Sequence, residues 1–524
     1  MIFGKPLKRV EVAYDGLRSY QIQDVLEAER VAVGIWYDPR LGKSRTAVRT
    51  IIRWIREGGF KKHVIIGPLT ALEITWQNEL EKAGFGIVGR DNSQWGKGEG
   101  AVFPLLRPPA GQSKGIWASG VIHRMIHADL MVPSIVLVND DLLHKSFKTG
   151  PRGGAYNLGD LIIKWEPDSI TLDEAHRIKN PGSKRSEALR RMGRHTRFRR
   201  ALTGTPNPNG AKDIFGQFVF LDPEVFGTNF SDFRIKYFHF NAVTGKVEGW
   251  RSPELEAEFQ KKVASRVHIV RATDQFPDLP PVIEIKRHID LPENLQGPYD
   301  QLEDVGVIDN ATENIFLECA HVLPQFTRMQ QLAAGYLPKF TTSPDQVPLE
   351  GVDWKHDEKL TSIISDLEEP IEAGQKCVIS YRWRPEGERI AAMLRKAYGE
   401  STVVELNGST KNREEVVAPF NIDAPDTGSP VRIIVVQEAT GGVGISLARA
   451  DHLHFVTWSW DYAAVEQMRK RIWHPEKKRM TETFHIMSGT IDETIYRAIK
   501  DKHSVSFMVK TLGLHAMTKG AVGE

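Results

Sequence analysis

Cysteine is nearly absent from this chain, and long apolar runs are missing altogether. Two cysteines, Cys319 and Cys377, occur among 524 residues. Two are too few for a disulfide framework or a cysteine zinc site, and they suit a reducing compartment. No stretch approaches the roughly 20 apolar residues that span a membrane, and no signal-peptide-like run opens the chain. These absences predict a soluble intracellular protein without a membrane partner.

Excess charge of either sign is also lacking. The 69 lysines and arginines nearly balance the 67 acids, which leaves a formal net charge of +2. Any contact with nucleic acid must therefore come from local patches. The 524 residues exceed the roughly 300 that one core usually serves, so more than one domain is expected.

Short apolar runs alternate with helical patterns in both halves of the chain. Strands are predicted at residues 31–36, 63–67, 134–138, 170–172, 377–380, 402–406, 431–436 and 452–456. Residues 46–55 carry a helical apolar face. Alternating strands and helices predict an α/β fold with mostly parallel sheets. We expect one lobe at residues 1–206, a helical protrusion and linker at 207–281, and a second lobe at 282–524 with a helical insertion near 301–350.

A phosphate-binding turn is predicted between the first strand and its helix, at Asp38 to Ser44. Backbone N–H groups and a helix N-terminus attract anions at such a turn. Lys43 would reach the β- and γ-phosphates and Ser44 would hold Mg²⁺. The motif is incomplete, because Tyr37 and Arg40 stand where glycines would be expected. Gly-Lys-Ser alone leaves an ordinary turn as an alternative.

An acidic pair, Asp173-Glu174, follows the apolar run 170–172. Nucleotide hydrolysis needs such a pair: Asp173 would hold Mg²⁺ and Glu174 would orient and deprotonate the attacking water. The alternative is a strand end that leads into a helix whose first turn favours acids. The upstream Gly-Lys-Ser favours the catalytic interpretation.

The blocks Asp173-Glu174-Ala175-His176 through Asn180 and Leu202 to Asn207 resemble the Swi/Snf-type branch of superfamily-two helicases and translocases, with a DEAH-type second motif. Further similar blocks follow in family order at residues 17–21, 67–79, 213–227, 271–281, 407–420, 441–447 and 460–473. The resemblance therefore runs from residue 17 to about 475.

The resemblance implies two tandem RecA-like lobes that close around ATP and step along DNA. It assigns hydrolysis to Lys43, Asp173, Glu174, Gln467 and Arg471, with Arg471 stabilising the transferring phosphoryl group. It assigns ATP and Mg²⁺ binding to Arg18, Gln21, Leu41, Gly42, Lys43, Ser44, Asp173, Gly444 and Arg471, with Gln21 reading the adenine and Ser44 and Asp173 holding the metal. Thr203 and Thr205 would couple nucleotide state to the DNA-facing side.

DNA contacts implied by the resemblance are Pro68, Leu69, Asn139, Asp140, Ser380, Tyr381, Asn407, Gly408, Gly442 and Trp460. Most would be backbone-directed and independent of sequence. Tyr381, Trp383, Trp458 and Trp460 could stack on single-stranded bases, although aromatic residues at strand ends more often pack. Six arginines between Arg190 and Arg200 form a basic cluster that is either a phosphate contact or a solvated helix face.

One position departs from the family. The last motif usually has a second arginine three residues after the first, where this chain has His474 followed by Pro475. A mostly neutral histidine lacks the fixed guanidinium fork. Either Arg471 suffices, Arg469 or Lys470 substitutes, turnover is slow, or His474 takes no catalytic part.

The leading hypothesis is an ATP-dependent translocase on duplex or branched DNA. A strand-separating helicase that tracks single strands is the nearest alternative, and a nucleic-acid-binding module with impaired ATPase is a third. The chain is short for the family, which favours a bacterial or phage DNA-processing motor in the cytoplasm over a nucleosome remodeller. We expect it to act as a monomer on DNA; its protein partners stay open.

Overall fold

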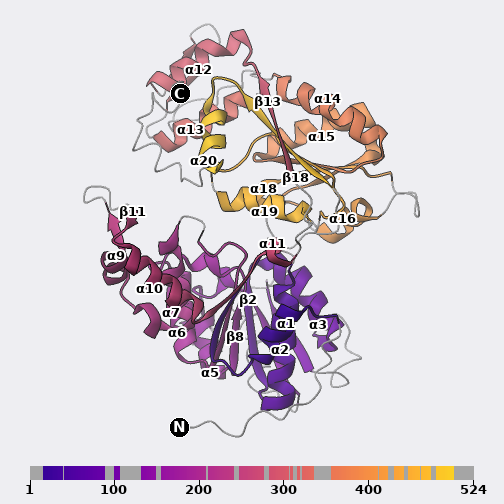
Figure 1. Cartoon of the computed structure of the whole chain (residues 1–524). Coiled ribbons are helices and arrows are strands. Elements are labelled where there is room, and N and C mark those ends of the chain that lie inside the picture. Colours follow the sequence, from indigo (N-terminus) through magenta and orange to yellow (C-terminus); the bar gives the residue numbers. More distant parts are fainter. Residues whose placement is uncertain are drawn as a thin grey trace. The chain divides into compact units, whose positions relative to one another are not determined.

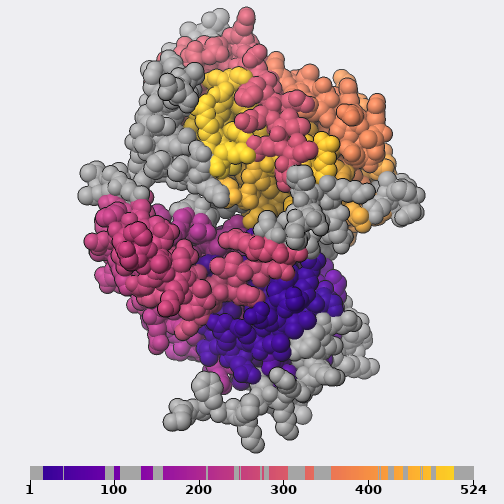
Figure 2. Space-filling model, viewed as in Figure 1, coloured from indigo at the N-terminus to yellow at the C-terminus, as the bar shows by residue number. Residues whose placement is uncertain are grey.

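The chain forms two compact units, Met1–Pro277 and Asp278–Glu524, each built around its own sheet. The computed structural model in Figures 1 and 2 describes residues 16–38, 41–88, 100–106, 132–148, 155–207, 210–240, 247–275, 282–305, 307–310, 315–318, 322–335, 356–410, 412–422, 430–441, 447–460, 462–473 and 479–500. The units are described separately.

The first unit contains an eight-stranded sheet in the order β12-β1-β9-β8-β2-β5-β4-β3. Its strands are β1 (Ala32–Tyr37), β2 (Lys62–Gly67), β3 (Phe85–Ile87), β4 (Gly100–Leu105), β5 (Ser134–Asn139), β8 (Ser169–Leu172), β9 (Phe198–Leu202) and β12 (Val267–Val270). Every neighbouring pair is parallel. Parallel strands are covered on both faces, which explains their continuous apolar runs.

Helices cover both faces of this sheet (Figure 1). They are α1 (Ser19–Leu26), α2 (Lys43–Gly58), α3 (Gln77–Lys82), α5 (Leu158–Trp165), α6 (Lys184–Arg194) and α7 (Phe215–Leu221), with the short helices η1 (Ala71–Trp76), η3 (Asp140–Leu142), η4 (Ala175–Ile178) and η5 (Ala211–Ile214). Successive side chains of β2 point to opposite faces of the sheet and so contact different helices. His63 stacks on Trp54 of α2, whereas Val64 and Ile66 join the core beneath α5 to α7.

Residues 210–275 pack with the first unit. They form α8 (Pro223–Phe226), α9 (Phe230–Tyr237), α10 (Pro253–Ala264), α11 (Ala272–Gln275) and the hairpin β10 (Phe238–Phe240) with β11 (Val247–Trp250). An aromatic cluster around Phe226, Phe233 and Phe259 holds α9 and α10, which lie together at the surface in Figure 2. β12 lies inside the range predicted as protrusion and linker, yet it pairs with β1. The predicted linker motif, residues 278–281, lies outside the described residues. A second hairpin joins β6 (Ser146–Lys148) and β7 (Ala155–Asn157).

The second unit contains a six-stranded sheet in the order β13-β20-β19-β16-β18-β17, again parallel throughout. Its strands are β13 (Val282–Ile289), β16 (Cys377–Tyr381), β17 (Val403–Leu406), β18 (Ile433–Gln437), β19 (His452–Phe455) and β20 (Met480–Met487). Its helices are α12 (Glu293–Val305), α13 (Val322–Ala333), α14 (Glu358–Glu372), α15 (Arg384–Tyr398), η6 (Glu400–Thr402), α16 (Arg413–Asn421), α18 (Glu438–Gly441), α19 (Tyr462–Ile472) and α20 (Ile491–Lys500).

Within the predicted insertion near 301–350, the described residues form the end of α12, the hairpin of β14 (Val307–Asn310) with β15 (Ile315–Glu318), and α13. α14 and α15 cover one face of the second sheet through a core that includes Leu360, Ile379 and Ile390. Two α/β units with parallel sheets confirm the predicted fold class. In the described part of the chain, no helix combines the length and apolar character needed to cross a membrane.

Candidate functional site

Three predicted motifs meet at one edge of the first sheet. The strands β1, β9 and β8 are adjacent and parallel. Gly42-Lys43-Ser44 follows β1, Thr203 to Thr205 follow β9, and Asp173-Glu174 follow β8. The carboxyl ends of neighbouring parallel strands share an edge, which is where ligands bind in open α/β sheets. The topology therefore brings the predicted phosphate turn, acidic pair and coupling threonines together.

The phosphate turn is shaped by Gly42, which begins α2. Its φ of 78° lies in the left-handed region, and a Cβ there would come within 2.3 Å of the Gln21 side chain. Lys43 occupies the first position of the helix, and its Nζ donates to the carbonyl oxygens of Tyr37 at 3.0 Å and Asp38 at 3.5 Å. Ser44 follows, partly buried. Pro39 and Arg40 lie outside the described residues.

The Gln21 side chain is hydrogen-bonded to the phosphate turn. Its Nε2 donates to the carbonyl oxygens of Leu41 at 3.3 Å and Gly42 at 3.2 Å, and its Oε1 accepts from the Arg18 N–H at 2.9 Å. The Tyr20 hydroxyl also donates to Leu41 O, at 3.0 Å. The predicted adenine-reading element and the phosphate turn are thus one hydrogen-bonded assembly.

Asp173 is buried at the end of β8 and is fixed through both oxygens. Oδ2 accepts from the Trp76 indole N–H at 2.8 Å, and Oδ1 accepts from the Glu174 N–H at 2.9 Å. Burial, reinforced by the Glu174 carboxylate and opposed by Trp76 and Lys43, raises the pKa of Asp173 to about 6. A buried carboxylate beside a second one favours a cation at this position.

Glu174 is connected to the coupling threonines through His176. Nδ1 of His176 lies 3.2 Å from Oε2 of Glu174, 3.2 Å from Oγ1 of Thr203 and 3.4 Å from Oγ1 of Thr205. The Thr205 N–H donates to Thr203 Oγ1 at 3.1 Å. Glu174 itself has φ 50° and ψ 50°, a left-handed conformation that is uncommon outside glycine.

Trp76 and His176 lie within two of the blocks that carry the resemblance, but neither residue was assigned a role from the sequence. His176 stands two residues beyond Glu174, a spacing at which a short turn can bring the two side chains together. Nothing in the sequence signals the Trp76 contact, because it joins residues 97 apart, Trp76 at the end of η1 and Asp173 just after β8.

The second unit carries Gln467 and Arg471 on α19, both partly buried. The Arg471 carbonyl oxygen accepts from Leu447 N–H at 3.1 Å, which joins the end of α19 to the chain after the glycine motif. Gly442, Gly444 and His474 lie outside the described residues, so the predictions that rest on them are untested.

Several predicted DNA contacts lie inside the protein. Pro68 and Asn139 are buried and Leu69 is partly exposed. Asp140 is buried against Arg177 at 2.9 Å and Arg185 at 3.3 Å. Burial, opposed mainly by those two arginines, raises the pKa of Asp140. In this structure Pro68, Asn139 and Asp140 therefore expose little of either their side chains or their main chain.

In the second unit, the side chains of Ser380 and Tyr381 are fully buried. Trp458 is buried as well, so stacking of Tyr381 or Trp458 on bases is contradicted by their packing. Trp460 is partly exposed, and its ring stacks on Phe326 with centroids 5.4 Å apart.

At the turn after β17, Gly408 is exposed and its N–H donates to Gln437 Oε1 at 3.1 Å. Beside it, Asn407 donates to Glu405 Oε1 at 2.8 Å.

Part of the arginine cluster at 190–200 is structural. Arg200 is buried over the Trp54 ring, Arg199 donates to the carbonyl oxygens of Leu221 and Gly193, and Arg191 pairs with Asp160. These contacts favour a packing role for Arg199 and Arg200, whereas Arg194 and Arg197 are exposed.

Comparisons with known proteins agree with the motif series. Residues 134–325 match a family described as the SNF2-related domain. The chain is 26% identical over 354 residues to YwqA of Bacillus subtilis, whose name describes an ATP-dependent helicase/translocase; the alignment covers 66% of this chain and 35% of YwqA. It is 24% identical over 385 residues to the DNA repair and recombination protein RAD54-like of Drosophila erecta, covering 66% of this chain and 46% of that protein.

The chain therefore spans less than half the length of these curated relatives. Among solved structures, the Sulfolobus solfataricus SWI2/SNF2 ATPase core in complex with dsDNA aligns over 98% of this chain and 96% of its own, at 19% identity and a TM-score of 0.38. The SNF2-related match confirms the predicted resemblance to Swi/Snf-type superfamily-two proteins.

Proposed function

We propose that this chain, which carries an SNF2-related domain and two parallel α/β units, is a DNA-dependent ATPase that moves along duplex or branched DNA. One observation carries the proposal: Lys43, Asp173, Glu174 and Thr203 come together at the edge formed by β1, β9 and β8. The relatives whose names describe a translocase and a DNA repair protein support the choice of DNA.

Lys43 and the first-turn amides of α2 would bind the phosphates of ATP, since a helix N-terminus and an ammonium group both favour anions. Gln21 would act on the nucleotide through the turn that it holds in place. By resemblance, Gln467 and Arg471 of α19 would complete the chemistry, with Arg471 stabilising charge on the transferring phosphoryl group.

Mg²⁺ fits the residues at this edge. The buried Asp173 carboxylate has a raised pKa beside Glu174, and Ser44 offers a hydroxyl, so the available donors are hard oxygens. When bound, Mg²⁺ neutralises phosphate charge. Trp76 would keep the Asp173 carboxylate oriented, and Glu174 would orient the attacking water.

His176 offers a route from this site to Thr203 and Thr205. A change at Glu174 would alter its 3.2 Å contact with His176, whose ring also contacts both threonine hydroxyls. We expect contact with DNA to be directed largely at its sugar-phosphate backbone, as the resemblance implies, although the buried Pro68, Asn139, Asp140 and Ser380 offer DNA little surface. Such contacts read no sequence. Action as a monomer, a preference for branched DNA and a bacterial or phage origin stay predictions.

The proposal is tested by steady-state ATP hydrolysis without nucleic acid, with single-stranded DNA, with duplex DNA and with a four-way junction. Lys43→Ala serves as the blank. Lys82→Ala is the matched control, because its side chain is 73% exposed on α3. We expect duplex or junction DNA to stimulate the wild type and Lys82→Ala, and to leave Lys43→Ala at background.

Two other results would change the assignment. Stimulation by single strands alone would replace the translocase with a single-strand-tracking helicase. Hydrolysis no higher than that of Lys43→Ala with every DNA would leave a nucleic-acid-binding module with an impaired ATPase.

A further inference from the structure

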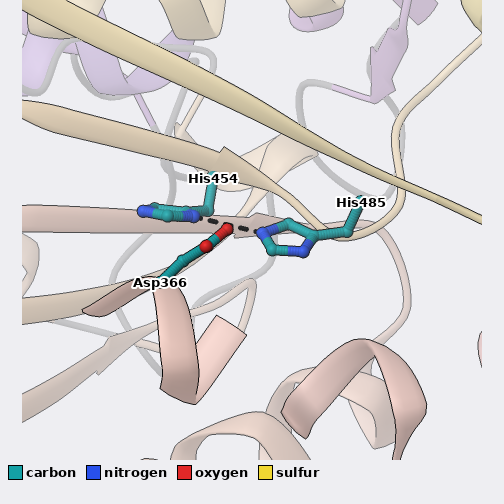
Figure 3. Close-up of side chains that lie close together, drawn as sticks. All are labelled: Asp366, His454 and His485. Atoms are coloured by element: carbon teal, nitrogen blue, oxygen red, sulfur yellow. Dashed lines mark hydrogen bonds between the residues drawn. The ribbon is translucent and has the colours of Figure 1, made fainter. Parts of the chain in front are cut away.

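Three side chains outside the proposed ATP site converge inside the second unit: Asp366 from α14, His454 from β19 and His485 from β20 (Figure 3). Their nearest ligand atoms all lie within 4.8 Å of one another. His485 and His454 are buried, and the Asp366 side chain is 14% exposed. Figure 3 shows the Asp366 carboxylate pointing toward the line that joins the two imidazoles. We propose that these residues form a binding site for one divalent transition-metal ion of the zinc class.

The hydrogen bonds of the two imidazoles are incomplete. Nδ1 of His454 lies 3.1 Å from Nε2 of His485, and Nδ1 of His485 lies 3.0 Å from Oγ of Ser362. In the described part of the chain, Nε2 of His454 has no hydrogen-bond partner. A neutral imidazole has one donor and one acceptor nitrogen, so among the described residues Nε2 of His454 stays unsatisfied in either tautomer, with or without a metal ion between the two facing nitrogens.

A metal ion suits the pair of facing nitrogens. Two nitrogen ligands about 2.0–2.1 Å from a tetrahedral zinc ion lie roughly 3.3 Å apart, close to the 3.1 Å found here.

Outer hydrogen bonds would hold two of the three ligands. Ser362 Oγ can accept from the Nδ1–H of His485 once Nε2 binds metal. Arg287 Nε donates to both oxygens of Asp366 at 2.9 Å and so orients the carboxylate. Such partners fix the tautomer and direction of metal ligands. Mixed nitrogen and carboxylate donors suit zinc-class ions better than Mg²⁺ or Ca²⁺.

The charged groups around the three ligands determine how strongly the site is expected to bind a metal ion. Arg287 and Lys359 both repel positive charge at the rings, and Asp366 is the single anionic ligand. Binding should therefore be weaker than at a cysteine-rich zinc site. A fourth ligand would have to be water or another group. The three ligands connect α14 to two central strands, so the ion would stabilise the second unit.

The test uses the full chain, stripped of metal by a chelator and titrated with Zn²⁺ alone, without nucleotide or DNA. Equilibrium dialysis measures the bound equivalents, and thermal unfolding measures the shift in Tm. Wild type should bind one equivalent more than Asp366→Asn and His485→Gln, and Zn²⁺ should raise the Tm of wild type only. Asp366→Asn is the decisive variant because it keeps the side-chain volume at a partly exposed position.

His452→Gln is the matched control, since His452 lies on the same strand as His454 and its Nε2 lies 2.7 Å from Gln375 Oε1. It should bind Zn²⁺ as the wild type does. Equal binding by wild type and Asp366→Asn, or none by wild type, would overturn the proposal and leave a His–His hydrogen bond alone. Any Zn²⁺ that binds at the ATP site would bind to wild type and variants alike, so it does not affect the difference in bound equivalents. Neither readout depends on ATP hydrolysis, so a failure here leaves the proposed function unaffected.

Discussion

At the scale of single residues, the hydrogen bond from the Trp76 indole orients the first carboxylate of the acidic pair. The indole N–H donates to Asp173 Oδ2 at 2.8 Å, and Asp173 is the residue proposed to hold Mg²⁺. We expect Trp76→Phe to lower ATP hydrolysis about 10- to 100-fold, because outer partners of metal ligands have effects of that size. Raising Mg²⁺ should restore part of the loss. Steady-state kinetics at several Mg²⁺ concentrations would measure both.

Trp165→Phe is the control for that substitution. Trp165 is buried in the same unit, but its indole N–H has no hydrogen-bond partner in the described part of the chain. The control therefore makes the same indole-to-phenyl change at another buried position and removes no hydrogen bond to Asp173. A loss of activity as large in Trp165→Phe would show that ring volume, and not the Asp173 contact, matters.

Glu482 provides a pH-dependent prediction. Burial, opposed by Arg469 and reinforced by the adjacent Glu284 carboxylate, raises the pKa of Glu482 to about 6. An acid whose folded pKa is raised contributes stability that is fully present below its unfolded pKa and is lost as pH rises through the folded pKa. Relative to Glu482→Gln, which does not titrate, wild type should gain stability as pH falls from about 7 to 5.

Urea unfolding of both proteins at the two pH values measures this difference. A change in the opposite direction would show that Glu482 is the ionised member of the pair and that Glu284 takes up the proton. Glu284→Gln, measured in parallel, would then show the dependence predicted for Glu482→Gln.

At the scale of elements, α19 is held to its sheet by Arg469. The guanidinium lies 2.8 Å from Glu482 on β20, 2.8 Å from Glu466 on its own helix and 3.6 Å from Glu284 on β13. Gln467 and Arg471 lie two residues to either side. We infer that Arg469 fixes the helix that carries both proposed catalytic side chains. It was considered from the sequence only as a substitute for the missing second arginine.

Arg469→Met should destabilise the protein by about 2–3 kcal/mol, somewhat below the roughly 3–5 kcal/mol of a fully buried pair, since the arginine is 17% exposed. ATP hydrolysis should fall with it, because α19 loses its position. Arg497→Met is the control: its pair with Glu493 is 48% exposed on the arginine side, and its loss should cost less than about 1 kcal/mol. Similar unfolding midpoints for the two variants would contradict the inference.

Eight of the fourteen described strands in the two parallel sheets were predicted from sequence, because parallel strands are buried on both faces and appear as short apolar runs. Runs at 63–67 and 170–172 correspond to β2 and β8 within a residue. The strands β3, β4, β9, β12, β13 and β20 were missed; in β12, for example, His268 interrupts the apolar run at the sheet edge. The turn and acidic pair were predictable from local motifs. Trp76, His176 and the buried positions of Asn139 and Tyr381 depend on contacts between distant segments, which no local pattern encodes.

At the scale of the whole molecule, each unit has its own sheet, and no described strand of one sheet is hydrogen-bonded to the other. Separate cores predict two thermal transitions rather than one. Ile170→Val in the first core and Ile379→Val in the second should each lower one transition, by about 0.5–1.5 kcal/mol. Differential scanning calorimetry of the two variants would thus assign the transitions.

Once each thermal transition is assigned to a unit, the unit that binds nucleotide can be identified. A slowly hydrolysed ATP analogue with Mg²⁺, at about 100 times its Kd, adds roughly 2.7 kcal/mol to whatever binds it, or about 5–10 °C for a unit of this size. The transition lowered by Ile170→Val should rise by that amount, because Lys43, Ser44 and Asp173 all lie in the first unit. Lys43→Ala should abolish the rise. A shift confined to the transition lowered by Ile379→Val would place the nucleotide on the second unit, where no phosphate turn exists among the described residues.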